Sequence, residues 1–232
     1  TVTTIIKLGI RLMIILFFLP VHEYAHGYVA CKLGDPTAKN MGRLTLNPLA
    51  HLDMMGSAMI LLIGFGWAKP VPINPRNFKE PKKGFAITAA AGPLSNLVLG
   101  FFSAFIYLLF YALVKDIPFE SKNFLFHLIS NTLTFLYIFH SVNIGLALFN
   151  LIPIPPLDGS RLLNIILPPK TYFEIMKYEK KIYIGMLVWL FLGDYVAQIV
   201  RSFAPIAANP ILYWIAGIFS LSEMLGVAIG WV

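Results

Sequence analysis

The sequence contains little charge and almost no cysteine. Of its 232 residues, 12% are charged and 58% are hydrophobic, and the mean hydropathy is +0.75. The apolar residues exceed what the core of a soluble domain can hide, so the composition excludes a soluble protein and indicates one integral membrane domain over residues 1–232. The single cysteine, Cys31, excludes an internal disulfide and a zinc site built from cysteines.

Acidic residues are scarce as well, which leaves a formal net charge of +7. No basic run is interleaved with aromatic residues, so we expect no nucleic-acid partner. The positive charge instead suits loops that contact the anionic headgroups of a lipid bilayer.

Long hydrophobic runs dominate what remains. They predict an all-α polytopic membrane protein with about five transmembrane helices, over residues 4–33, 83–114, 124–151, 181–200 and 207–231. The apolar run at 54–65 has about a dozen residues, whereas a full span needs about 20, so it predicts a re-entrant or interfacial helix. Short extended strands are expected at 42–48, from its alternating pattern, and at 67–75, where prolines exclude a helix.

The first hydrophobic run contains His22-Glu23-Tyr24-Ala25-His26. Histidines four residues apart lie on one face of a helix and can share a metal ion. Glu23 then lies beside the metal, where it can act as a base, which is the HExxH arrangement of zinc proteases. Polar residues inside an apolar helix are costly unless they serve a function. The pattern predicts one Zn²⁺ per chain; the alternative is a polar cluster that bridges helices by hydrogen bonds.

A catalytic zinc site takes three protein ligands and keeps one position open. The candidates for the third ligand are Asp158, His51, Asp53, His127 and His140. His127 begins a helix on the far side of the membrane, and a packed histidine is the usual interpretation of His140 in mid-helix. His51 and Asp53 lie in a loop on the correct side and stay open. We favour Asp158, because the prolines before it force non-helical backbone, which membranes tolerate only around a water-filled cavity; the alternative is an ordinary Asp-Gly turn.

The distribution of Lys and Arg predicts the orientation. Residues 32–83 and 154–181 together contain 13 of these residues, and the rest of the chain contains five. Cytoplasmic loops are enriched in Lys and Arg. We therefore expect both stretches, and the active site between them, on the cytoplasmic side of the plasma (inner) membrane of a prokaryote.

Five motifs, taken together and in order, resemble the site-2 proteases, a family of intramembrane zinc metalloproteases. They are His22-Glu-Tyr-Ala-His26, Gly42-Arg-Leu-Thr-Leu-Asn-Pro48, Gly64-Phe-Gly-Trp-Ala-Lys-Pro-Val-Pro72, Ala91-Gly-Pro-Leu-Ser-Asn96 and Asn150-Leu-Ile-Pro-Ile-Pro-Pro-Leu-Asp-Gly159. The resemblance covers roughly residues 15–165 and is to a compact form without PDZ or CBS domains. It implies a catalytic core at about 4–165, with accessory helices at about 178–232.

The resemblance also implies site residues and an activity. Zinc would be held by His22, His26 and Asp158, Glu23 would be the base, and Asn96 and Asn150 would act near the site. We expect hydrolysis of peptide bonds within or near transmembrane segments of membrane protein substrates, after the substrate helix unwinds.

Three asparagines could stabilise the oxyanion, namely Asn96, Asn143 and Asn150, and each could instead bond helix to helix. Two other functions are alternatives to the protease. A metal-binding membrane transporter would need polar residues on both halves of its path, and the outer half offers little beyond His140. A non-proteolytic membrane scaffold with a structural zinc would not need Glu23.

The proline-rich stretch at 69–74 suggests a substrate clamp. Pro70 and Pro72 lack an N–H group, so one edge of this extended segment cannot donate hydrogen bonds. Val71 and Ile73 keep their N–H groups on the other edge. That edge could pair with an unwound substrate as an added strand; the alternative is a rigid connector.

Overall fold

The part of the chain that the computed structural model describes is built from helices. It comprises all residues except 1, 65, 116, 118–123, 189–191 and 193–232, and it contains no β-strand. Three of its helices are long and apolar enough to cross a membrane: Leu8–Lys32, Pro81–Val114 and Phe124–Leu151. They correspond to the first three of the five predicted spans.

The N-terminal helix is continuous but changes its winding just before the HExxH motif. Its parts are α1 (Val2–Met13), a π-helical turn (Ile14–Phe18) and α2 (Leu19–Lys32). The N–H of Leu19 bonds the carbonyl of Ile14, five residues back. Pro20 accounts for the wider turn, because it lacks an N–H and its ring crowds the carbonyl of Leu16.

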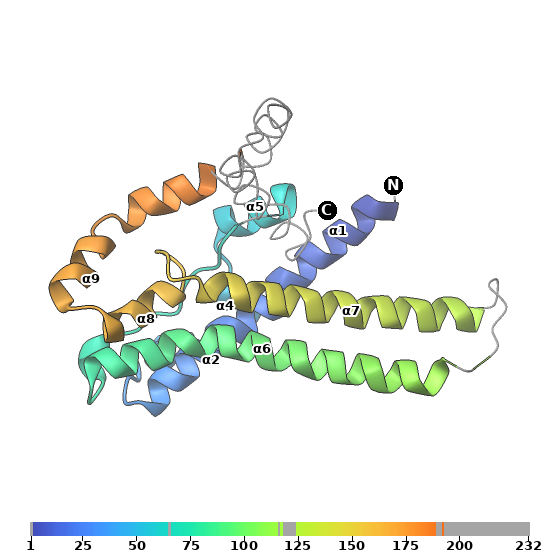
Figure 1. The fold of residues 1–232 in the computed structure, drawn as a ribbon, viewed down its shortest axis with the longest axis horizontal. Coiled ribbons are helices and arrows are strands. Elements are labelled where there is room, and N and C mark those ends of the chain that lie inside the picture. Colours follow the sequence, from blue (N-terminus) through green and yellow to red (C-terminus); the bar gives the residue numbers. More distant parts are fainter. Residues whose placement is uncertain (1, 65, 116, 118–123, 189–191, 193–232) are drawn as a thin grey trace, which may run out of the picture.

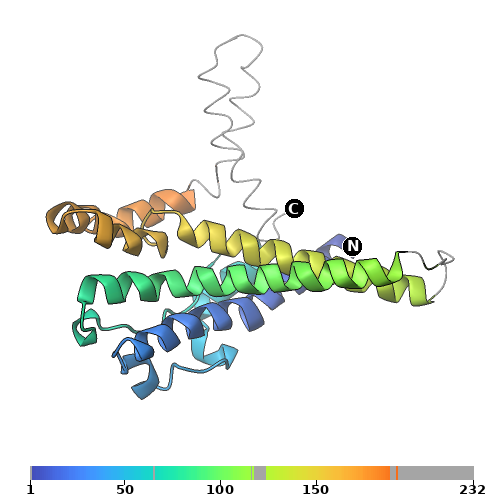
Figure 2. The same ribbon diagram turned by 60° about the horizontal axis from the view of Figure 1, so that its bottom comes forward.

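Helices α6 (Pro81–Val114) and α7 (Phe124–Leu151) lie side by side and antiparallel along the length of the molecule (Figure 1, Figure 2). The N-terminal helix packs against them through a small core. Phe18 is fully buried there, and its ring meets Phe139 edge-on with centroids 4.8 Å apart. Outward-facing side chains such as Phe101 and Phe105 are more than 60% exposed, as expected of surfaces that face lipid.

The short helix expected at 54–65 is α5 (Met54–Ile63), with ten residues. Asp53 caps its start by accepting the N–H of Gly56, and Gly64 ends it at a positive φ of 85°. Arg11 of α1 donates to the carbonyls of Leu61 and Leu62 at 2.7 and 3.1 Å. The last turn of α5 is therefore fixed to the N-terminal helix.

The prediction of a strand at 42–48 is wrong. The chain runs through α3 (Thr37–Asn40) and a turn at Gly42 before α4 (Pro48–His51). The hydroxyl of Thr45 accepts the N–H of Asn47, and the Asn47 side chain in turn accepts the N–H of Leu49. These local bonds compete with strand pairing for the backbone. The stretch at 66–74 is non-helical, as its prolines predict, but no strand pairs with it among the described residues.

After α7 the chain forms α8 (Gly159–Ile166) and α9 (Pro169–Met176), which gather at the end where α6 begins (Figure 1). Residues 179–188 are again helical and include the start of the fourth predicted span. The rest of that span and the fifth span, 207–231, lie outside the described residues.

Candidate metal centre

His22 and His26 project from one face of α2, as their spacing predicts, and each is only 6% exposed. Their Nε2 atoms lie 3.1 Å apart. The Nδ1 atom of His26 lies 2.7 Å from the carbonyl oxygen of Thr88 in α6. Because a carbonyl only accepts, Nδ1 carries the proton, and the lone pair of Nε2 is left for a metal.

Asp158 reaches the same point from the start of α8. Its Oδ2 atom lies 3.0 Å from His22 Nε2 and 3.2 Å from His26 Nε2. Burial alone raises the pKa of this carboxyl, but the adjoining His26 and His22 outweigh burial and hold the pKa well below its usual range. Asp158 thus places a carboxylate oxygen beside the two imidazoles, as the third member of a candidate ligand set.

Gly159 explains how the chain delivers Asp158 to this point. A Cβ atom at Gly159 would lie 2.2 Å from the carbonyl oxygen of Leu151, so only glycine allows the turn to fold back onto the end of α7.

The dimensions of this group fit zinc. Tetrahedral zinc with bonds of about 2.0–2.2 Å separates its ligand atoms by about 3.3–3.6 Å. The three ligand atoms lie 3.0, 3.1 and 3.2 Å apart, within a few tenths of an ångström of that triangle. Two imidazoles and one carboxylate are also a donor set that catalytic zinc uses.

Gly92 of α6 leaves the space that such an ion needs. A Cβ atom there would lie 2.4 Å from His26 Nε2 and 2.6 Å from His22 Nε2. Any larger residue would occupy the region toward which both nitrogens point. Gly92 lies in the Ala91–Asn96 motif of the family resemblance, but no role at the site was predicted for it or for the carbonyl of Thr88.

The other candidate ligands have separate structural roles. His51 is buried and bonds the carbonyl of Thr45 at 2.8 Å, and Asp53 caps α5. The Nδ1 of His140 donates to the carbonyl of Gly100 at 2.9 Å. The ring of His127 meets that of Phe126 edge-on near the start of α7. Among the described residues, only His22, His26 and Asp158 form a group that could hold a metal ion.

Glu23 lies beside this group and accepts a hydrogen bond from the backbone of Val71. The distance from Val71 N to Glu23 Oε2 is 2.8 Å. On the same edge, Lys69 N donates to the carbonyl of His51 at 2.8 Å. The edge proposed as a substrate clamp therefore faces the protein at Lys69 and Val71, and the structure does not present it as a free strand edge.

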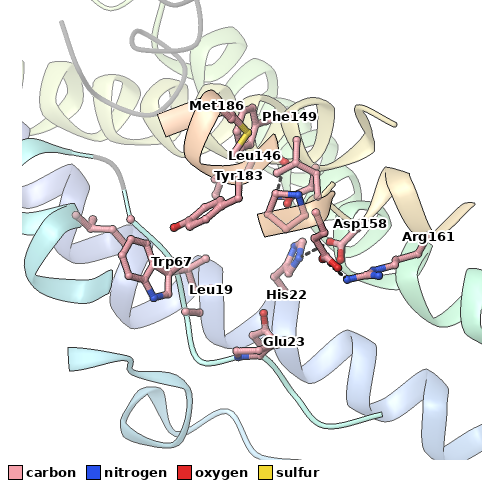
Figure 3. A pocket seen from close by; sticks show the side chains of 18 of the residues that line it. Leu19, His22, Glu23, Trp67, Leu146, Phe149, Asp158, Arg161, Tyr183 and Met186 are labelled. Carbon is pink, nitrogen blue, oxygen red and sulfur yellow. Dashed lines mark hydrogen bonds and ion pairs between the residues drawn. The ribbon is translucent and has the colours of Figure 1, made fainter. Parts of the chain in front are cut away.

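A cavity of about 880 Å³ opens beside His22, Glu23 and Asp158 (Figure 3). The spanning helices line it with Leu19, Leu146 and Phe149.

The segment after α9 also lines this cavity: Met186 and Tyr183 lie near Leu146 and Phe149 (Figure 3), and Tyr183 meets Trp67 with ring centroids 6.0 Å apart. Residues 176–186 thus help to form the cavity, although the sequence placed everything after 178 among accessory helices.

The three asparagines differ in position. Asn150 lines the cavity and its Nδ2 donates to the carbonyl of Leu146 at 2.9 Å. Asn96 and Asn143 are buried at 1% and 0% exposure and do not line it. Asn143 donates to the carbonyl of Phe139. The geometry therefore favours Asn150 for contact with a substrate.

The family model that matches this chain is described as peptidase family M50, over residues 10–193. The chain belongs to peptidase family M50. The expected resemblance to site-2 proteases is thereby confirmed. The chain is a zinc metallopeptidase and an integral membrane protein, and its cofactor is zinc.

Individual relatives agree with this membership. "Putative zinc metalloprotease YwhC" of Bacillus subtilis is 42% identical over 178 residues, which cover 76% of this chain and 78% of that protein. "Zinc metalloprotease MJ0392" of Methanocaldococcus jannaschii is 30% identical over 203 residues, 86% of this chain and 44% of that protein. "Putative zinc metalloprotease Rip2" of Mycolicibacterium smegmatis is 27% identical over 179 residues, 74% of this chain and 63% of that protein. No solved structure shows significant similarity to the chain.

Proposed function

We propose that this peptidase hydrolyses peptide bonds within or near the transmembrane segments of membrane protein substrates. The proposal is supported by the position of the three candidate ligands. They lie beside a cavity whose apolar wall is formed by the spanning helices, with Leu19 of α2 and Phe149 of α7 among its lining residues. A substrate that reaches the triangle through this wall is itself a membrane segment, and it must unwind, because a helical carbonyl is already hydrogen-bonded.

In this proposal His22, His26 and Asp158 would hold the zinc ion. When bound, it would supply a Lewis acid for the scissile carbonyl and lower the pKa of water toward about 7. Glu23 accepts the proton of the attacking water and returns it to the leaving amine nitrogen. Asn150, on the cavity wall, donates a hydrogen bond to the substrate backbone.

The proposed orientation places the site toward the cytoplasm, in the plasma membrane of a prokaryote. It is supported by the gathering of the start of α6 with α8 and α9 at one end of the molecule (Figure 1). These elements carry four of the 13 Lys and Arg residues of the two stretches: Lys82, Lys83, Arg161 and Lys170. The end of α6 and the start of α7 lie at the opposite end.

The test is cleavage of single-span membrane proteins that are co-reconstituted with the enzyme in liposomes. Glu23→Gln should retain zinc and lower the cleavage rate by roughly 100-fold or more, because an amide cannot accept the proton. Zinc flux without cleavage would favour the transporter. Zinc binding with neither flux nor cleavage would favour the scaffold, and full activity in Glu23→Gln would refute the role of Glu23.

A further inference from the structure

The segment at 66–74 is docked along α2 at defined points. Val71 N–H bonds Glu23 Oε2 at 2.8 Å, and the side chain of Val71 lies against Gly27, one helical turn further on. The N–H of Asn74 then bonds Oδ2 of Asp35 at 2.7 Å, just beyond the end of α2. The contacts follow the direction of the helix, so they set the register of the segment against it.

Val71 is held closely at this position. Its side chain is 6% exposed, and a Cβ atom at Gly27 would lie only 3.2 Å from its Cγ1 atom. Pro70 before it has a fixed φ angle, and Pro72 after it restricts Val71 itself to extended backbone, so the chain around Val71 has few alternative conformations. The N–H of Val71 therefore has a fixed direction, toward α2.

Glu23 depends on an outside partner for a fixed position. Its side chain has three rotatable bonds and is only half-buried. Among the residues that the structure describes, no hydrogen bond other than that of Val71 reaches this carboxylate. Oε2 is thus anchored and Oε1 remains able to accept a proton. A hydrogen bond from a neutral N–H to a carboxylate is charge-assisted and stronger than a neutral one.

We propose that the backbone N–H of Val71 is a positioning group that holds the carboxylate of Glu23 in its catalytic orientation. The inference rests on the proposed role of Glu23 as the base. The segment at 69–74 then contributes to catalysis by orienting the enzyme's own base, whereas a substrate clamp would need the N–H groups of both Val71 and Ile73. One N–H cannot serve Glu23 and a substrate strand at the same time.

The test removes this N–H and keeps the Val71 side chain; it also weakens the carbonyl of Pro70, which accepts a long hydrogen bond from Arg43 at 3.3 Å. Replacing Val71 by the α-hydroxy acid with the same side chain turns the amide into an ester and keeps the isopropyl group. We expect kcat to fall roughly 10- to 100-fold, because one charge-assisted hydrogen bond is lost. KM and zinc content should stay unchanged. The matched control is the same replacement at Ile73, on the same edge but without a bond to Glu23, where kcat should change less than about threefold.

A second measurement does not depend on activity. In the zinc-loaded protein, Glu23→Ala should accelerate hydrogen exchange of the Val71 amide by roughly tenfold or more. The Lys69 amide, which bonds His51, should keep its exchange rate and serves as the internal reference.

The outcomes separate the possible explanations. Equal losses at Val71 and Ile73, or a rise in KM with kcat unchanged, would refute positioning and support the clamp. An unchanged kcat in the Val71 ester, together with an inactive Glu23→Gln, would refute the inference and leave the proposed function intact. Full activity in Glu23→Gln would instead refute the proposed function itself.

Discussion

Gly92→Ala should disable the metal centre through a single methyl group. The added Cβ atom would lie 2.4 Å from His26 Nε2 and 2.6 Å from His22 Nε2. Non-bonded heavy atoms prefer about 3.5 Å, so the overlap is about 1 Å on each ring. To relieve this overlap, both imidazoles must move by about 1 Å, which separates their Nε2 atoms from the arrangement that can share an ion, or α6 must withdraw from α2.

The expected loss of zinc affinity is roughly 100-fold or more, equivalent to about 2.7 kcal/mol, since even changes outside the ligand set cost about 10- to 100-fold. The assay is zinc content after equilibration with chelators of graded affinity, followed by cleavage of a reconstituted substrate. Helix propensity acts in the opposite direction, because alanine stabilises a helix interior by about 1 kcal/mol relative to glycine. A loss of zinc therefore cannot result from a weaker helix.

Gly100→Ala is the matched control, two turns along the same helix. Its Cβ atom would meet the Cδ1 and Cγ1 atoms of Ile144, at 2.7 and 2.9 Å, in a side chain that can rotate away. Zinc affinity should stay within about threefold of that of the unaltered protein, which is a change in binding free energy of less than about 1 kcal/mol. Wild-type zinc affinity in Gly92→Ala would refute the placement of α6 against the histidine pair.

Three further predictions follow from other parts of the structure. His26→Ala should abolish zinc binding while His140→Gln retains it, as measured by metal analysis; loss in both would mean that the ligand set is wrong. Burial raises the pKa of Asp35, but hydrogen bonds from its neighbours outweigh burial and lower that pKa. The ionised carboxylate therefore stabilises the fold fully at neutral pH, and this contribution is lost as the pH falls through the lowered pKa. Asp35→Asn should therefore lower the unfolding free energy by roughly 1–3 kcal/mol at pH 7 and by less in acid, in denaturation experiments, and an equal loss at both pH values would contradict this. Single cysteines at Lys79 and Lys170, with the native cysteine replaced by alanine, should react with an impermeant reagent from the same, cytoplasmic side; labelling from opposite sides would mean that α5 crosses the membrane.

The candidate ligand set was predictable because each of its members depends on a local rule. His22 and His26 share a face by helical periodicity, and the prolines before Asp158 exclude a helix there. Long apolar runs identified the three spanning helices for the same reason. The strand at 42–48 failed where another local rule applied: the side chains of Thr45 and Asn47 take up the backbone N–H groups that a strand partner would need.

What the sequence did not reveal depends on contacts between distant segments. Val71 and Glu23 are 48 residues apart, and the alternation of prolines showed only that Val71 keeps an N–H group, without naming its acceptor. The wall at 176–186 was missed for a similar reason. Its place at the cavity is supported by the ion pair between Arg161 of α8 and Glu179, and nothing in the local sequence distinguishes Glu179 from any other surface charge.

The candidate metal centre requires a fixed register between α6 and α2. Thr88 and Gly92 are four residues apart, as are His22 and His26, so one turn of α6 faces one turn of α2. The carbonyl of Thr88 orients His26, and the missing side chain of Gly92 leaves space at both Nε2 atoms. A shift of one residue would bring Ala91 or Pro93, each with a Cβ atom, to the position of Gly92. Small residues let membrane helices approach closely in general; here the missing side chain of Gly92 leaves the space that an ion shared by the two histidines would need.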